Sequence, residues 1–172
     1  MKILNKHLLL KRFYLRHLTS RDATDEYLSW FDDDRVADFI DYAKQRHDKQ
    51  DLKAYIRARN SSTSCCFLGI FTISDDIHIG NIKYDPIDFT TLSAEMGILI
   101  GSKSYRGKGV GPEVISGSTM FLKQLMGLKS ITLGVRSDNL QAVRAYKKIG
   151  YIITRETVGA DNNRILRMVH EL

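Results

Sequence analysis

The stretch that decides the fold lies between a strand-like and a helix-like segment and reads Arg106-Gly107-Lys108-Gly109-Val110-Gly111. Its glycines allow positive φ and let main-chain N–H groups approach an anion closely. The free N–H groups and the dipole at a helix N-terminus attract negative charge, and Arg106 and Lys108 add charge pairing. We therefore expect a phosphate-binding loop, with a merely flexible turn as the alternative.

Two well-known glycine loops do not fit this stretch. A Walker loop needs Ser or Thr directly after its lysine, whereas Gly109 follows Lys108 and position 102 is serine. A dinucleotide fingerprint that starts at Gly107 places its last glycine where the sequence has Pro112. The loop therefore belongs to another class of phosphate site.

The flanking pattern predicts alternating strands and helices. Helices are expected after the capping segment at Ser20, over 49–59, from the glycines to Gly127, and from position 138 or 139 to Gly150. Pro86 is expected to break the strand pattern. Strands are expected over 8–15, 65–73, 77–84, 93–100, 130–135, 151–158 and 164–170. Without linkers or repeats, residues 1–172 form a single domain with a mixed α/β sheet.

A second motif follows the loop over 133–151, where a strand leads to Asn139 and a helix carries Tyr146 before Lys148-Ile149-Gly150-Tyr151. Together, the two motifs resemble the GNAT superfamily of N-acetyltransferases, and the closest branch includes ribosomal-protein N-terminal and bacterial amino-sugar acetyltransferases. The resemblance implies an α/β (α+β) fold with a twisted, mixed, mostly antiparallel sheet of about six to seven strands and about four helices. It is clearest over 77–151.

The resemblance also implies a role for acetyl-CoA as co-substrate. It assigns Asn139 to the pantetheine arm and Tyr146 to protonating the departing thiolate as general acid. It further implies that the backbone of Met96, Ile98 and Ile100 pairs with the pantetheine amides. The pyrophosphate would lie on the glycine loop, whose residues are Arg106, Gly107, Lys108, Gly109, Val110 and Gly111.

Each side-chain assignment has a plainer alternative. Asn139 also fits a helix cap, and Tyr146 also fits a core aromatic. Seven residues at about 100° each place these two side chains on nearly the same helix face, so both can reach one ligand. Glu95, an acid within an apolar strand, is the candidate general base that deprotonates the amine, with an ordinary salt bridge as the alternative.

Composition excludes several other classes of protein. The adjacent Cys65 and Cys66 cannot staple distant segments, and the five scattered histidines lack metal-ligand spacing, so no metal is expected. The net charge of +6 is spread along the chain without a nucleic-acid recognition element. No apolar stretch is long enough for a membrane span. We expect a cytoplasmic protein that binds neither nucleic acid nor membrane; a homodimer is left open.

The sequence thus predicts direct acetyl transfer to a primary amine. An amino-sugar nucleotide is preferred as acceptor, and a protein N-terminus, a polyamine or an aminoglycoside is the alternative. A module that binds acetyl-CoA without catalysis is a further alternative, as is a nucleic-acid-binding domain. The acceptor site is expected to involve aromatic and acidic residues of the N-terminal third, namely Tyr27, Trp30, Asp32, Asp33, Asp34 and Tyr42, although the aspartates also fit a solvated turn.

Overall fold

The computed structural model describes residues 3–4, 7–33, 36, 47–159 and 162–172. Among them, nine strands form one mixed sheet in the order β1-β2-β3-β4-β5-β6-β7-β9-β8. Every neighbouring pair is antiparallel except β6 and β7, which run parallel. The strands are β1 (Ile3–Leu4), β2 (His7–Leu9), β3 (Phe13–His17), β4 (Cys66–Thr72), β5 (His78–Asp88), β6 (Ser93–Ile100), β7 (Ser130–Arg136), β8 (Ile152–Val158) and β9 (Arg164–Glu171).

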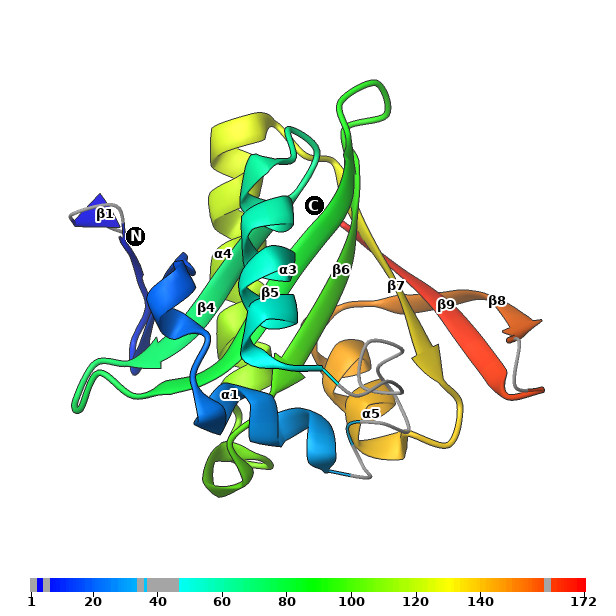
Figure 1. The fold of residues 1–172 in the computed structure, drawn as a ribbon. Helices are drawn as coiled ribbons and strands as arrows, with labels where there is room; N and C mark the ends of the chain where they lie inside the picture. The colour runs from blue at the N-terminus through cyan, green and yellow to red at the C-terminus, as the bar shows by residue number, and fades with distance from the viewer. Residues whose placement is uncertain (1–2, 5–6, 34–35, 37–46, 160–161) are drawn as a thin grey trace.

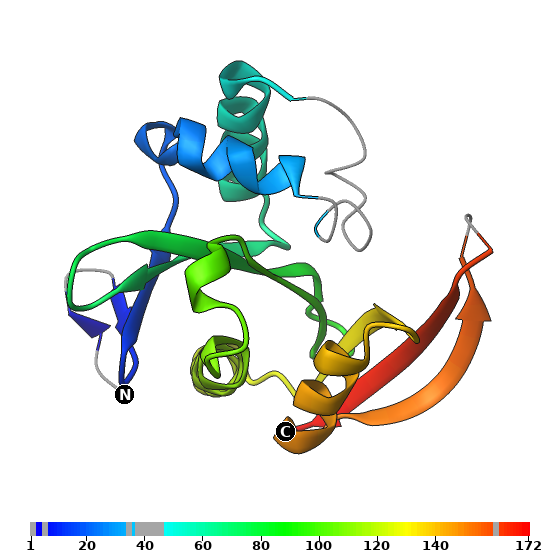
Figure 2. The same ribbon diagram turned by 90° about the horizontal axis from the view of Figure 1, so that it is seen from below.

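Helices cover both faces of this sheet (Figures 1 and 2). One face carries α1 (Asp25–Ser29) and α3 (Lys49–Ser61), and the other carries α4 (Val110–Met126) and α5 (Leu140–Ile149). Sequence signals explain their bounds: Asp48 caps α3 with a capping box, and left-handed Gly127 and Gly150 end α4 and α5. The expected mixed α/β fold is confirmed.

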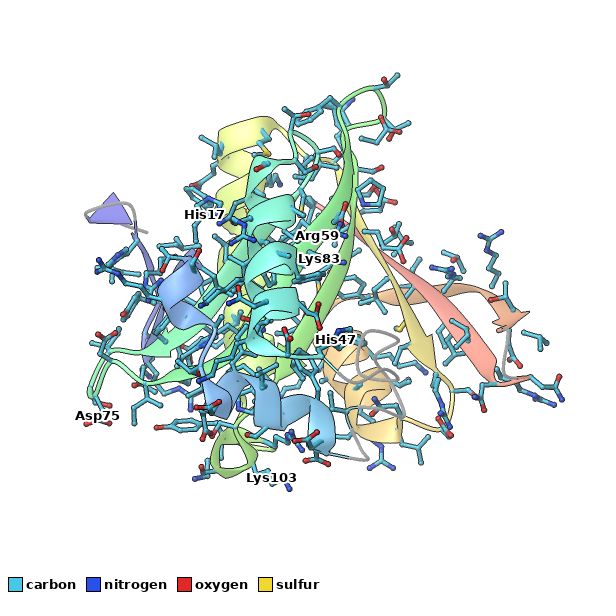
Figure 3. The ribbon with its side chains drawn as sticks, in the orientation of Figure 1. His17, His47, Arg59, Asp75, Lys83 and Lys103 are labelled. Carbon is cyan, nitrogen blue, oxygen red and sulfur yellow. The ribbon has the colours of Figure 1, made fainter. Side chains whose placement is uncertain are left out.

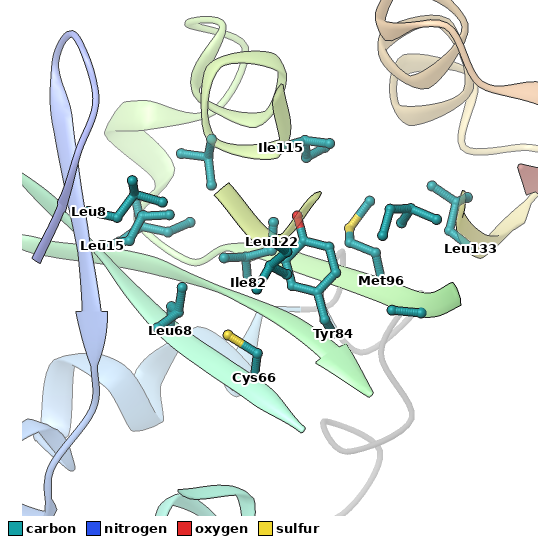
Figure 4. Packing of buried hydrophobic residues seen from close by; sticks show 14 of the residues in the cluster. Leu8, Leu15, Cys66, Leu68, Ile82, Tyr84, Met96, Ile115, Leu122 and Leu133 are labelled. Atoms are coloured by element: carbon teal, nitrogen blue, oxygen red, sulfur yellow. The ribbon is translucent and has the colours of Figure 1, made fainter. Parts of the chain in front are cut away.

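The main core lies between the sheet and α4 (Figure 4). Leu15, Ile82, Ile115 and Leu122 are almost fully buried there. The Tyr84 hydroxyl is also buried and lies 2.8 Å from the hydroxyl of Ser118 on α4. A second cluster on the opposite face packs α1 and α3 on the sheet through Tyr27, Trp30, Leu52, Ile56, Phe67 and Phe71. Both faces of the central strands are therefore held rigidly by helices.

Three local expectations were wrong. The single strand expected over 8–15 is split by a turn at 10–12 into β2 and β3, and with the additional β1 this raises the strand count to nine. The helix after Ser20 is interrupted, giving 3-10 turns over Ser20–Asp22 and Trp30–Asp32 around α1. Pro86 does not end β5, because a bulge between Tyr84 and Ile87 removes it from the ladder.

The functionally important feature is the divergence of β6 and β7. The two strands pair at only three positions, Ser93↔Ser130, Ala94↔Ile131 and Glu95↔Thr132. Beyond Glu95, β6 keeps its partner β5 while β7 keeps its partner β9. In Figure 1 the two strands separate below their paired ends, and α5 lies beside the opening. Among the described residues, the edge of β6 from Met96 onward therefore has no strand partner on this side.

Candidate active site

The glycine loop forms the start of α4. Gly107 and Gly109 both have a φ of 74°, a left-handed conformation that favours glycine. Gly109 is the N-cap of α4 and has no side chain with which to cap the helix, so the first-turn N–H groups meet no side-chain acceptor among the described residues. Gly111 differs from expectation, because it lies within α4 without a left-handed φ, and outside its own helix no atom of a described residue lies within 4 Å of the position that a Cβ would take.

The charged side chains of the loop differ in their availability. The Arg106 guanidinium donates to the Ile100 carbonyl at 2.8 Å, the Gly101 carbonyl at 2.8 Å and the Asp33 carboxylate at 2.7 Å. This side chain therefore fixes the loop to the end of β6 and to the segment after α1. The Lys108 side chain is exposed, and its Nζ lies 5.9 Å from the centroid of the Tyr105 ring. The Arg106 side chain is thus engaged within the protein, whereas the Lys108 ammonium has no ion pair with a described residue.

Arg12, which the motif analysis missed, supports the loop from the β2–β3 turn. Its backbone N–H and Nε donate to the Glu113 carboxylate at 2.8 and 2.7 Å, and its Nη1 donates to the Lys108 carbonyl at 3.0 Å. The arginine thereby neutralises the acid in the first turn of α4, which would otherwise repel an anion. No local pattern announces this contact, because the two residues lie 101 positions apart.

A cavity of about 1040 Å³ begins at the glycine loop and continues along the divergent strands. Its lining includes the β6 residues Met96 to Ile100 together with the loop residues Arg106, Gly107, Gly109, Val110 and Gly111. The Ala94 carbonyl accepts a hydrogen bond from Thr132 on β7, at 3.4 Å. Since successive residues of a strand point their carbonyls in opposite directions, those of Met96 and Ile98 face the same open side. An extended, amide-bearing ligand can pair there.

Asn139 and Tyr146 line the same cavity, as their seven-residue spacing predicts. The Asn139 side chain is also the cap of α5, since its Oδ1 accepts from the Ala142 N–H at 3.2 Å. Capping leaves the amide NH₂ able to donate into the cavity. The Tyr146 ring packs 5.8 Å from the Tyr151 ring, and burial raises the pKa of Tyr146 to about 12. Its hydroxyl therefore stays protonated near neutral pH.

Glu95 lies beside this cavity rather than in its lining. Its Oε1 accepts a hydrogen bond from Nη1 of Arg167 at 3.0 Å, and both side chains are nearly half exposed. Arg167 extends from β9 across Gly134 on β7, where an added Cβ would lie 3.1 Å from the arginine Nη1. The structure thus shows the salt bridge that was the alternative for Glu95, formed across the point where the strands separate.

The opposite half of the cavity, under α1 and α3, is lined by Tyr27, Phe31, Tyr55, Phe67, Asn81 and Lys83. Asn81 donates to the Tyr27 hydroxyl at 2.7 Å, and its Oδ1 lies 3.0 Å from His78 Nε2. Burial lowers the pKa of His78, which favours a neutral ring. Because Nε2 also meets the Gly80 carbonyl at 3.0 Å, the hydrogen must reside on Nε2. These hydrogen bonds fix the orientation of the Tyr27 side chain in the cavity wall.

The acidic residues expected at the acceptor site are placed differently. Asp33 is buried in its ion pair with Arg106, while Asp32 and Trp30 lie outside the lining. Asp34 and Tyr42 lie outside the described residues. Within the described ranges, no cluster of His, Cys, Asp or Glu has a metal-binding arrangement. In that same part of the chain, no helix has the length and apolarity that crossing a membrane requires.

Comparisons with known proteins agree with this geometry. The family model described as acetyltransferase (GNAT) domain matches residues 12–152. No curated protein matches the sequence. A GNAT-family acetyltransferase from Bacillus anthracis superimposes with a TM-score of 0.80 at 17% identity, covering 96% of this chain and 98% of that one.

Two further solved structures share the fold at low identity. The spermidine N-acetyltransferase from Vibrio cholerae, in complex with CoA and spermine, has a TM-score of 0.81 at 17% identity, with 93% and 95% of the two chains covered. RimL, a ribosomal L7/L12 α-N-protein acetyltransferase in complex with CoA, has a TM-score of 0.87 at 10% identity, with 96% and 98% covered. With the family model matching most of its length, this chain belongs to the GNAT acetyltransferase family.

Proposed function

We propose that this protein transfers the acetyl group of acetyl-CoA directly to a primary amine. The observation that carries the proposal is the uncapped start of α4, which opens into the same cavity as the unpaired edge of β6 and the Tyr146 side chain. An anion site, an edge for amide pairing and a protonated hydroxyl are the three features that a CoA thioester requires of its binding protein.

The donor half of the cavity fits acetyl-CoA chemically. The N–H groups at the start of α4 and the Lys108 ammonium would hold the pyrophosphate, and Arg144 and Lys148 on α5 add positive charge to the lining. The backbone of Met96 and Ile98 would pair with the amides of the pantetheine arm, and the Asn139 NH₂ would donate to it. Ile100 contributes through its N–H, since its carbonyl already accepts from Arg106. Acetyl-CoA supplies an activated acetyl group on a thioester.

Tyr146 is proposed to donate its proton toward the departing sulfur. Burial raises the pKa of this hydroxyl to about 12, so it stays protonated near neutral pH. That value also sets a limit, because a thiol ordinarily titrates near 8.5 and a free thiolate would not take the proton completely. Tyr146 therefore acts chiefly by donating a hydrogen bond as negative charge develops on sulfur, and the attacking amine releases the proton that completes the exchange.

The attacking amine must lose a proton, and Glu95 or a water chain is proposed to accept it. Glu95 is nearly half exposed, so water can reach its carboxylate, but its ion pair with Arg167 holds it outside the cavity lining. A chain of water molecules from the cavity to Glu95 satisfies both observations. Since acetyl transfer to the amine is direct, neither Cys65 nor Cys66 is needed as a nucleophile, and burial raises the pKa of both thiols, which keeps them protonated.

The acceptor is proposed to be a small-molecule primary amine, with an amino-sugar nucleotide preferred over a protein N-terminus. The support is the sequence resemblance of the N-terminal segment to the amino-sugar branch. The fold does not choose between a small-molecule amine and a protein N-terminus, because the spermidine and the ribosomal-protein enzymes both superimpose with TM-scores above 0.8.

The experiment that tests the proposal combines binding with turnover. Acetyl-CoA should raise the melting temperature, since a ligand that binds only the folded state stabilises it by about 2.7 kcal/mol at one hundred times its Kd. An amine panel, with released thiol as the readout, should then identify acceptors. No melting shift at millimolar acetyl-CoA would remove the proposal. A shift without any turnover, including single turnover, would favour a binding module over an enzyme.

A further inference from the structure

The charged side chains that line the cavity share one sign. Among the described residues, the lining holds six cationic side chains and no carboxylate: Lys83, Arg106, Arg136, Arg144, Lys148 and Arg167. Four of them belong to the donor half, on the glycine loop, at the end of β7 and on α5. Arg106 and Arg136 are paired with Asp33 and Asp138, and the charge of Arg144 and Lys148 on α5 is explained by a phosphate-bearing donor. Lys83 and Arg167 are not explained in this way.

The positions of Lys83 and Arg167 follow from strand register. Lys83 on β5 is opposite Gly97 on β6, and Arg167 on β9 is opposite Gly134 on β7. The neighbouring residues Ile82 and Met168 are buried in the main core beneath α4, and strand side chains alternate between faces. Lys83 and Arg167 therefore lie on the face of α1 and α3, opposite the helix whose N-terminus forms the donor loop.

The two cations differ in how far their charge is balanced. Arg167 is matched by Glu95, at 3.0 Å. Lys83 lies 3.5 Å from the Asp85 carboxylate, but the same carboxylate oxygen already accepts from Arg59 at 2.6 Å. Figure 3 shows Arg59 and Lys83 next to each other beside α3. Two cations share one anion here, so within the described residues this cluster keeps one positive charge, and Lys83 carries it at the cavity wall.

The space beside Lys83 is shaped to receive a ligand. Apart from its chain neighbours, no atom of a described residue lies within 4 Å of the position that a Cβ on Gly97 would take, so the strand opposite Lys83 leaves room among these residues. Tyr55 and Phe67, whose rings meet edge to face at 5.6 Å, form an apolar wall of the same cavity. An acceptor could lie on this wall with one end near Lys83 and its amine at the open edge of β6.

We propose that Lys83 binds an oxyanion, a phosphate or a carboxylate, of the amine acceptor, and so selects acidic acceptors over polyamines. The inference rests on the proposed acetyl transfer and adds the charge of its substrate. A half-buried ammonium attracts an oxyanion through a charge-assisted hydrogen bond, whereas a polycation placed beside Lys83 is repelled by it, and no carboxylate among the described lining residues offsets that repulsion. Lys83 is thus a specificity residue, and it takes no part in the bond exchange.

The test uses acceptors that differ only in charge. D-glucosamine is compared with D-glucosamine 6-phosphate, and β-alaninamide with β-alanine, while spermidine serves as the polycation. Lys83→Gln should lower kcat/KM for the preferred anionic acceptor by about 10- to 100-fold, the value of one charge-assisted hydrogen bond, through a higher KM. The neutral partner should change less than about twofold. Lys83→Arg should keep most of the anion preference, and the KM for acetyl-CoA should stay constant.

Lys123→Gln is the matched control, because Lys123 is exposed on α4 and lies outside the cavity lining. It removes the same charge from the whole molecule and should leave the anion preference unchanged. Equal losses for neutral and anionic acceptors in Lys83→Gln would overturn the inference, as would a wild-type preference for spermidine. Either result leaves the proposed acetyl transfer standing, because turnover itself has then been observed.

A binding measurement covers the case in which none of these amines is acetylated. N-acetyl-D-glucosamine 6-phosphate, added with saturating CoA, should raise the melting temperature of the wild type more than that of Lys83→Gln. N-acetyl-D-glucosamine should not distinguish the two proteins. Equal melting temperatures with the phosphorylated compound would overturn the role of Lys83. Absence of any shift with CoA alone would instead count against the proposed function.

Discussion

Replacing Tyr146 by Phe should change catalysis without changing stability, because the substitution removes only the hydroxyl. The substitution keeps the ring contact with Tyr151, at 5.8 Å between centroids. The hydroxyl makes no hydrogen bond to any described residue, so its loss leaves no protein group unpaired and should change the free energy of unfolding by less than about 0.5 kcal/mol. A general acid contributes about 10² to 10⁴ in rate, which corresponds to about 2.7 to 5.5 kcal/mol of barrier.

The two effects therefore differ at least fivefold in free energy and can be measured on one preparation. Melting temperature reports stability, titration with acetyl-CoA reports affinity, and released thiol reports turnover at saturating substrates. We expect a variant that melts and binds acetyl-CoA like the wild type but turns over at least about a hundredfold more slowly. A stably folded variant with full turnover would remove Tyr146 from the mechanism. Lower stability with normal turnover per folded molecule would make it a packing residue.

Two further predictions concern the loop and its supports, and a third concerns the pH dependence of turnover. Gly109→Val should weaken acetyl-CoA binding and lower the stability by about 1–2 kcal/mol, because a β-branched residue is strained at a φ of 74°. Gly111→Val should also weaken binding, with a smaller loss of stability. Normal acetyl-CoA titrations of both folded variants would refute the loop assignment. Asp33→Ala should lower the free energy of unfolding by about 2 kcal/mol and raise the KM for acetyl-CoA, because it releases Arg106. An unchanged KM would contradict the role of Asp33 in supporting the loop. Since the pKa of Tyr146 is about 12, kcat/KM should rise with pH as the amine loses its proton and should show no decline below about pH 10. If kcat/KM instead falls near pH 8, and Tyr146→Phe abolishes that fall, the pKa of Tyr146 must lie far below 12.

Short-range patterns explain why much of the fold could be predicted from the sequence. The bounds of β6 and the glycines that end α4 and α5 follow from residues within one turn or one strand of each other. Asn139 and Tyr146 face one cavity because helix geometry fixes the angle between them. Two features were missed: the split of β2 from β3 and the continuation of β5 through Pro86. Both depend on the pairing with a neighbouring strand, which decides where a turn or a bulge forms.

The candidate site was predictable only where one segment builds it. The loop and the face of α5 are local, whereas the supports of the loop come from Arg12 and Asp33, which lie 96 and 73 positions away from the residues they hold. Lys83 carried no signal in the sequence, since an isolated lysine on a strand is ordinarily a solvated side chain. Its significance depends on Arg59 sharing the same carboxylate, which only the packing of α3 on the sheet brings about.

The separation of β6 from β7 has a consequence for how such a protein can change its substrate. Because the opening passes between two strands, the two halves of the cavity are built by different parts of the chain: the loop and α5 after position 100, and chiefly α1, α3, β4 and β5 before it. Substitutions at Tyr55, Phe67 or Lys83 can then alter the wall under α1 and α3 while the glycine loop and α5 stay intact. The two halves of the cavity can therefore diverge separately, except at Arg12 and Asp33, which lie early in the sequence but hold the glycine loop.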